Sequence, residues 1–212
     1  MSSDLKKLFS SASPSLNDDS PALSERLRSL AGPLADELLR MLQERNGFYA
    51  LESALHVFPS HSGQQAIGLD EWNDDALWRA EYQGMADGCL FFAEDVFGGQ
   101  FCIKDAKVFT FDPETGVLEY LADDIEGWAA AIVGDYDVLT GYPLAHQWQS
   151  RNGPLPANKR LLPKVPFVAG GEFVMGNLYL ADAAEGMKFR ADIANQIKSL
   201  PDGAQIRFNV VD

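Results

Sequence analysis

The sequence predicts an α+β fold in which a mainly antiparallel sheet is flanked by helices. Apolar residues recur at three- and four-residue steps before residue 45 and again after Asp182, as in amphipathic helices. Between Gly88 and Ala122 the pattern changes to short runs rich in Phe and Val, which indicates strands. Because helices and strands come in blocks, this class is favoured over a doubly wound parallel sheet.

The predicted organisation is a flexible arm, a helical extension and one α+β domain. Residues 10–22 are rich in Ser, Pro and Asp, so we expect residues 1–22 to be a flexible arm. Residues 23–45 form the helical extension, with a break at Gly32-Pro33. Its apolar stripe consists of Leu23, Leu27, Leu30, Leu34, Leu38, Met41 and Leu42. We expect the stripe to pack on the α+β domain of residues 46–212, and a coiled-coil or dimer contact is the alternative.

The domain of residues 46–212 is expected to begin with a short helix over residues 48–58. Residues 88–121 then read as four strands of an antiparallel meander. Their turns fall at Gly98-Gly99, where positive φ is needed, at Lys104-Asp105 and at residues 112–116.

The second half of the domain is expected to return to helix. A helix containing Trp128 should start behind a cap at Asp123 or Asp124, pack on one face of the sheet and continue, with a break near Gly141, to about residue 152. Residues 151–166 are Pro-rich and should be extended, and strand-like runs surround Gly170-Gly171. Asp182 and Glu185 have capping-box spacing for a helix that ends before Pro201, and residues 204–211 predict a last strand.

The charge of the chain is concentrated in one stretch. Residues 70–137 hold 17 acids and 3 bases, a difference of 14 that equals the net charge of −14 of the whole chain. The electrostatic field of so much negative charge repels phosphate and anionic lipid and attracts basic partners. We therefore expect a basic protein partner, no direct nucleic-acid ligand and no membrane association. A solvated face kept for solubility is the alternative interpretation.

The sequence shows no pattern for a cofactor or a metal. It lacks both phosphate-binding glycine motifs, and its three histidines, His56, His61 and His146, match no metal or triad pattern. Residues 70–75 resemble a calcium-binding loop only loosely. With two cysteines, Cys89 and Cys102, no disulfide framework is indicated, so we expect a cytoplasmic protein.

Paired carboxylates are the candidates for a functional surface. We expect the partner-binding residues to be drawn from Glu71, Asp74, Asp75, Glu94, Asp95, Asp123 and Asp124. Glu94 and Asp95 should point to opposite faces of a strand and so form no catalytic dyad. Trp72 and Trp78, in the same acidic stretch, are interpreted as core residues, with anchors of an interface as the alternative.

One long run of the sequence resembles a known family. The run CLFFAEDVFGGQFCIKDAKVFTFDPETGVLEYLADDIEGWAAAI has a strand ending in Glu94-Asp95, then Gly98 with Gln100 and Phe101, a DPETG hairpin and the helix of Trp128. It is similar to the signature of the SUKH superfamily, and the similarity extends over about residues 46–212. The resemblance implies an α+β domain and, for bacterial members, non-enzymatic immunity proteins that bind and neutralise toxins, often nucleases or deaminases.

Three functions follow as hypotheses. The first is a toxin-neutralising immunity protein that occludes a basic, nuclease-type toxin. The second is a regulatory interaction scaffold like the fungal cell-wall regulators of the same superfamily, with residues 1–45 in contact with other proteins. The third is a hydrolase that uses the paired carboxylates, although no nucleophile, base and orienting residue converge in sequence. The oligomeric state is left open between a monomer and a weak dimer.

Overall fold

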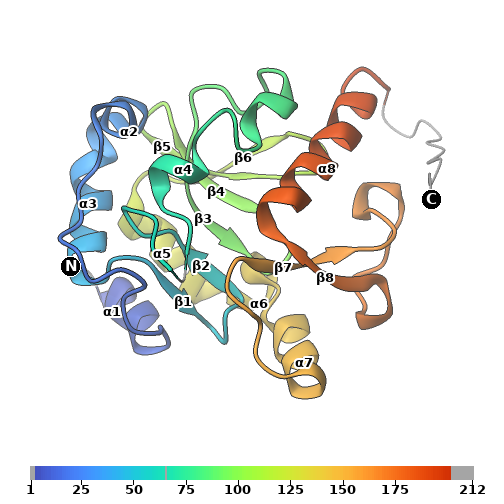
Figure 1. Ribbon diagram of the computed structural model, residues 1–212, viewed down its shortest axis with the longest axis horizontal. Helices are drawn as coiled ribbons and strands as arrows, with labels where there is room; N and C mark the ends of the chain where they lie inside the picture. The colour runs from blue at the N-terminus through green and yellow to red at the C-terminus, as the bar shows by residue number, and fades with distance from the viewer. Residues whose placement is uncertain (1–2, 65, 202–212) are drawn as a thin grey trace.

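A six-stranded antiparallel sheet forms the centre of the computed structural model, which describes residues 3–64 and 66–201 (Figure 1). Each strand pairs with its neighbour along the chain, so the order is β1-β2-β3-β4-β5-β6. The strands are β1 (Phe48–Ala50), β2 (Leu55–Val57), β3 (Leu90–Asp95), β4 (Gln100–Lys104), β5 (Lys107–Phe111) and β6 (Leu118–Ala122). The predicted α+β class and the meander over residues 88–121 are confirmed.

The turns of the meander have the expected backbone geometry. Gly98 has a φ of +78° between β3 and β4, which a residue with a Cβ adopts only with strain. Asp105 and Ala106 have φ of 49° and 58° between β4 and β5. This is the left-handed pair of a tight hairpin whose twist matches that of its strands.

The helix predicted over residues 48–58 is wrong, because this segment forms the hairpin of β1 and β2. Phe48 pairs with Val57, and Leu51, Glu52 and Ser53 between the strands all have φ between 52° and 64°. Three successive left-handed residues reverse the chain after only three residues of strand. An apolar run this short does not distinguish a helix from a buried strand by its period.

One face of the sheet is covered by α5 (Ile125–Gly134). Trp128 of this helix makes edge contacts with Phe92 and Phe101, at ring-centroid distances of 5.0 and 5.9 Å. Asp124 caps the helix by accepting a hydrogen bond from the backbone N–H of Gly127. The helical run continues through α6 (Tyr136–Thr140) and α7 (Tyr142–Asn152), with the predicted break at Gly141.

The opposite face is covered by aromatic residues that follow α4 (Leu69–Trp72). Trp78 packs edge-on against Phe91 of β3 at 5.0 Å and against Tyr82 of the 3-10 helix η2 (Arg79–Tyr82) at 5.5 Å. The Tyr82 hydroxyl donates to the Met187 carbonyl of α8 (Ala183–Ile197). Trp72 and Trp78 are completely buried, which confirms their interpretation as core residues.

The N-terminal segment is packed rather than free. Residues 3–10 form α1 (Ser3–Ser10), whose Leu5 and Leu8 are buried and which contacts α5. Arg45 donates three hydrogen bonds to the carbonyls of Phe9, Ala12 and Ser13. The expectation of a flexible arm over residues 1–22 therefore needs correction, because an amphipathic turn and an arginine fasten the described part of it.

The helical extension packs on the sheet as predicted. It comprises α2 (Glu25–Ala31), a 3-10 turn η1 (Gly32–Leu34) and α3 (Ala35–Glu44), with the break at Gly32-Pro33. Leu27 and Leu38 are completely buried in the same core cluster as the strands.

The C-terminal part forms a second, two-stranded sheet of β7 (Lys159–Pro163) and β8 (Leu178–Asp182) (Figure 1). Of the strand-like runs expected over residues 165–182, the last part is confirmed as β8, whereas the part next to Gly170-Gly171 is wrong, because residues 164–177 contain the 3-10 turns η3 (Phe167–Ala169) and η4 (Met175–Asn177) and no strand. Asp182 caps α8 as predicted, accepting from Ala184 and Glu185. The strand expected over residues 204–211 lies outside the described residues.

Candidate functional site

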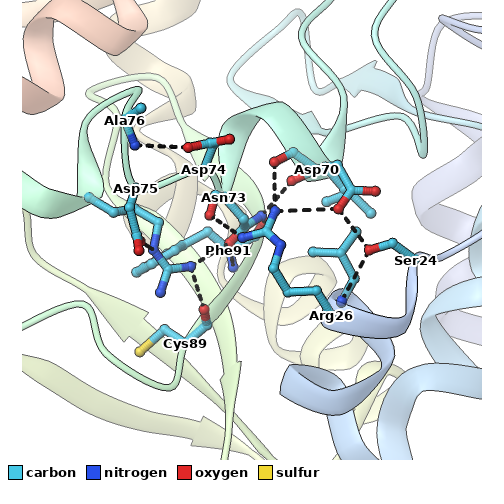
Figure 2. A network of polar contacts seen from close by, with 12 residues as sticks. Ser24, Arg26, Asp70, Asn73, Asp74, Asp75, Ala76, Cys89 and Phe91 are labelled. Carbon is cyan, nitrogen blue, oxygen red and sulfur yellow. Dashed lines mark hydrogen bonds and ion pairs between the residues drawn. The ribbon is translucent and has the colours of Figure 1, made fainter.

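Three of the predicted partner-binding acids lie together on α4 and the turn that follows it. Glu71, Asp74 and Asp75 are exposed and, with Asp70 and Arg26, line an open hollow on the surface. Figure 2 shows this region, with Asp70 beside Ser24 and Arg26 at the start of α2 and with Asp74 and Asp75 on the turn after α4. We call Glu71, Asp74 and Asp75 the α4 acids.

The backbone that carries the α4 acids is fastened to β3. Asn73 donates to the Phe91 carbonyl and accepts from the Phe91 N–H, both at 2.8 Å, in the manner of a neighbouring strand (Figure 2). The buried Arg79 donates to the carbonyls of Cys89 and Ala86 at 2.8 and 2.9 Å. These contacts hold the backbone of the acids in place, so little backbone entropy remains to be lost when they bind a partner.

Two arginines, Arg26 and Arg79, offset part of the charge at α4. Arg26 donates to the carbonyls of Asn73 and Asp70 and lies 3.3 Å from the Asp70 carboxylate, which also accepts from Ser24 (Figure 2). Asp75 lies 3.4 Å from Arg79 Nε, but its side chain is 81% exposed. Glu71 and Asp74 form no ion pair with the described residues, so the surface keeps a negative charge.

Glu94 does not belong to a binding surface, and its assignment as a partner-binding residue is corrected. Its side chain is 1% exposed and lies 2.9 Å from Arg160 Nη2, which is completely buried. Gln100 donates to Glu94 at 3.3 Å and accepts from the Trp72 indole N–H at 2.9 Å. A buried carboxylate with a buried cation and further donors is a structural element of the core.

His56 belongs to the same buried cluster as Glu94 and Arg160, and the surroundings of the cluster determine the protonation states of His56 and Glu94. His56 Nδ1 lies 3.0 Å from Glu94 Oε1, and the ring stacks on Tyr49. Burial opposes ionisation of Glu94, but Arg160, His56 and Gln100 outweigh it and hold the pKa of Glu94 below its usual range. Burial lowers the pKa of His56 to about 4, so the ring is neutral at pH 7. Since Glu94 is ionised, the ring proton is on Nδ1 and is donated to the carboxylate.

Asp95 turns away from this cluster, as the alternation of a strand requires. One of its oxygens accepts from the backbone N–H groups of Phe97 and Gly99, both at 2.8 Å, and so closes the turn to β4. Part of the residue remains accessible, yet burial of the carboxyl raises its pKa to about 7. Glu94 and Asp95 form no dyad, as predicted.

Asp95 faces a cavity of about 230 Å³ that the sequence did not reveal. Its walls include Asp95, Phe97, Glu114, Phe167, Phe173 and Arg190. Burial raises the pKa of Glu114, which accepts from the Val168 N–H. Arg190 is buried and uses its guanidinium on the carbonyls of Gly186 and Phe97. The cavity is formed by residues of β3, the turn after β5, the η3 segment and α8. These segments are far apart in the sequence, so no local spacing of residues predicts the cavity.

Asp123 and Asp124 lie just before α5, next to the edge strand β6, and so lie apart from the other predicted partner-binding residues. Asp124 is the helix cap, and Asp123 lies 3.0 Å from Lys107 across β5 and β6. Hydrogen bonds from Lys107 and Tyr120 lower the pKa of Asp123. Two strands separate β6 from the β3 strand under α4, so the seven predicted residues form no single cluster.

The described part of the chain holds neither a cluster of metal ligands nor a membrane-spanning helix. In residues 3–64 and 66–201, no group of three or more His, Cys, Asp or Glu side chains is arranged to hold a metal ion. Within the same ranges no helix is long and apolar enough to cross a bilayer. Cys89 and Cys102 are free and buried.

Comparison with known proteins relates this chain to others by fold. No protein-family model matches the chain, and no curated protein matches it. Its structure is similar to the crystal structure of Atu4351 from Agrobacterium tumefaciens, with a TM-score of 0.54 and 12% identity over 90% of this chain and 88% of the other. At this identity the similarity shows a shared α+β fold alone.

Proposed function

We propose that this protein binds a basic protein partner and neutralises it, as an immunity protein neutralises a nuclease-type toxin. The observation that carries the proposal is the exposure of the α4 acids on a backbone fastened to the sheet. A fixed group of carboxylates complements a cleft lined with Lys and Arg, such as one that binds nucleic acid. Occupation of that cleft by a folded surface is the proposed mechanism.

The charge of the whole chain assists this role. The net charge of −14 creates an attractive field for a cationic partner and repels phosphate. Screening limits such a field to about 8 Å at physiological salt, so steering should weaken as salt is added. Fast association suits a protein that must reach a toxin before the toxin reaches its substrate.

Binding rather than catalysis is supported by the surroundings of the acid and histidine pair. His56 and Glu94 are hydrogen bonded, as a catalytic base and its orienting acid would be, but both side chains are 1% exposed and Glu94 is paired with Arg160. A substrate would have to open the core to reach them. We place the protein in the cytoplasm as part of the same proposal, because its two cysteines are free.

The scaffold hypothesis receives less support from the fold. It relies on residues 1–45 to contact other proteins, but Leu8, Leu27 and Leu38 of this segment are buried in the core. Their apolar surface is therefore already used within the chain.

The test is capture of the partner followed by an activity assay. The full chain is cross-linked in the organism that encodes it, the captured basic protein is purified, and its toxic or nuclease activity is titrated with this protein. We expect activity to fall to background near a 1:1 ratio. Full activity of a tightly bound partner would contradict neutralisation.

Charge variants test in the same assay whether the α4 acids bind the partner. Glu71→Gln, Asp74→Asn and Asp75→Asn together should raise the concentration needed for inhibition. The matched control is Asp18→Asn, Glu44→Gln and Asp192→Asn, which removes the same charge from exposed acids elsewhere. An equal effect of the two triple variants would remove the assignment to α4.

A further inference from the structure

Three phenylalanines meet at the surface beside the Asp95 cavity. Phe167 and Phe173 stack at a centroid distance of 3.8 Å, and Phe97 contacts their edges at 5.5 and 5.6 Å. Phe173 is nevertheless 61% exposed. Its ring is held in place by its neighbours while much of its apolar surface faces solvent.

Phe97 and Phe173 separate two hollows. The first is the Asp95 cavity of about 230 Å³, and the second has a volume of about 340 Å³ and is lined by Val138, Leu144 and Pro143 as well as by the two phenylalanines. Each is large enough for one apolar side chain. Val138, 75% exposed, stands at the second hollow. We call Phe97, Val138, Phe167 and Phe173 the phenylalanine face.

The charges around the phenylalanine face are mainly negative. The exposed carboxylates are Asp112 at the first hollow and Asp137 at the second. Asp95 and Glu114 also line the first hollow, but burial raises the pKa of both. Among the described residues Arg190 is the one basic residue that lines either hollow, and it already donates to the carbonyls of Gly186 and Phe97. An apolar surface with pre-formed hollows and a charged rim is the usual anatomy of a protein interface.

The charge also selects among possible occupants. A second copy of this chain would bring another −14, so self-association is opposed by repulsion. An anionic membrane is opposed for the same reason. A partner segment that combines apolar side chains with lysine or arginine fits both features of the surface.

We propose that the phenylalanine face docks a segment of a basic protein, which inserts one apolar side chain into each hollow and places Lys or Arg beside Asp112 and Asp137. This interaction shares no residue with the α4 acids. It therefore goes beyond the proposed neutralising function and holds whether or not α4 contacts a toxin.

The test uses a display library of random 12-residue peptides, selected on the full-length protein and counter-selected on Phe173→Ser. We expect the enriched peptides to contain two apolar residues and several lysines or arginines. Peptide affinity is measured by fluorescence anisotropy. Phe173→Ser and Val138→Ser should each weaken peptide binding about tenfold, as expected for a residue at the centre of an interface. Both side chains are exposed, so both variants should fold.

Phe189→Ser is the matched control. Phe189 is 58% exposed, close to the exposure of Phe173, but lines neither hollow. Its substitution should leave peptide affinity within about twofold of the wild type. Absence of any peptide that distinguishes wild type from Phe173→Ser would overturn the proposal. So would enrichment of acidic peptides, a dimer in sedimentation that Phe173→Ser dissolves, or binding to phosphatidylglycerol vesicles that depends on Phe173.

Discussion

Glu94 and Glu71 are glutamates of the same acidic stretch, but their surroundings differ in every respect that matters to a charge. Glu94 is 1% exposed and is paired with Arg160, His56 and Gln100. Glu71 is exposed, accepts a hydrogen bond from Ser62 and has no cationic partner among the described residues. The first charge is used within the fold, whereas the second is available to a partner.

Asp95 stands between these two cases. It follows Glu94 directly on β3, but it faces a cavity, and its hydrogen bonds come from backbone N–H groups. Burial without a paired cation raises the pKa of Asp95 to about 7, whereas Arg160, His56 and Gln100 together outweigh the burial of Glu94. The comparison shows that a local count of acids overstates the charge of a surface, because burial and pairing decide which acids contribute to it.

The largest expected effect on stability comes from breaking the buried cluster of Glu94, Arg160 and His56. Arg160→Met leaves Glu94 buried without its cation, so the free energy of unfolding should fall by about 3–5 kcal/mol. Lys159→Met is the control, because Lys159 is partly exposed and lies 3.4 Å from Asp182, a pair worth less than about 1 kcal/mol. Urea denaturation of both variants measures the difference, and equal losses would contradict a structural role for the Arg160 pair.

Asp95 should make stability fall as pH rises. Its folded pKa of about 7 lies above the value near 4 of an unfolded Asp, so the folded state holds a proton that the unfolded state has lost. Relative to Asp95→Asn, the wild type should lose about 3 kcal/mol between pH 4 and pH 7, and the loss should level off about one pH unit above the folded pKa. Asn retains the oxygen that accepts from Phe97 and Gly99. A carboxyl-carbon NMR titration of Asp95 with a midpoint near 4 would refute the burial argument.

His56 should contribute in the opposite direction. Its folded pKa of about 4 lies below the value near 6.5 of an unfolded His, so its stabilisation is present above pH 6.5 and is lost as pH falls toward 4. We expect about 3 kcal/mol from this group, measured as the difference in pH dependence between wild type and His56→Gln. Parallel stability curves for the two proteins between pH 4 and 6.5 would show that the ring is already charged.

The smallest effect on stability is expected at α4. Glu71→Gln, Asp74→Asn and Asp75→Asn keep the acceptor oxygens that contact Ser62 and Ala76 and remove only exposed charge. The Tm of this triple variant should stay within about 2 °C of the wild type. Cooperative unfolding at a much lower Tm would mean that the α4 acids support the fold.

The sequence predicted the elements whose signals are local. The meander, the Trp128 helix, the Asp124 and Asp182 caps and the packing of the leucine stripe all follow from period, turn residues and capping positions. The hairpin of β1 and β2 was missed, because its reversal depends on left-handed residues that are not Gly or Asn.

The sites depend on pairings that no local pattern contains. Arg160 reaches Glu94 from a strand 66 residues away in sequence number, and Arg190 donates to Phe97 across 93 residues. The alternation of a strand did predict that Glu94 and Asp95 separate. It did not predict which of the two would be enclosed, since that depends on β2, which pairs with β3, and on β7, which brings Arg160 to Glu94 and donates from Leu161 to the Val96 carbonyl.

The association rate of the captured basic partner with this protein tests the central claim most directly. Stopped-flow measurements would compare wild type, the α4 triple variant and the scattered control triple at about 20 mM and 150 mM salt. We predict that salt slows association of the wild type, and that the α4 triple variant associates severalfold more slowly than the control triple with little change in dissociation. Association rates that do not change with salt, or that are equal for the two triple variants, would show that the α4 acids are a solubility surface and do not bind the partner.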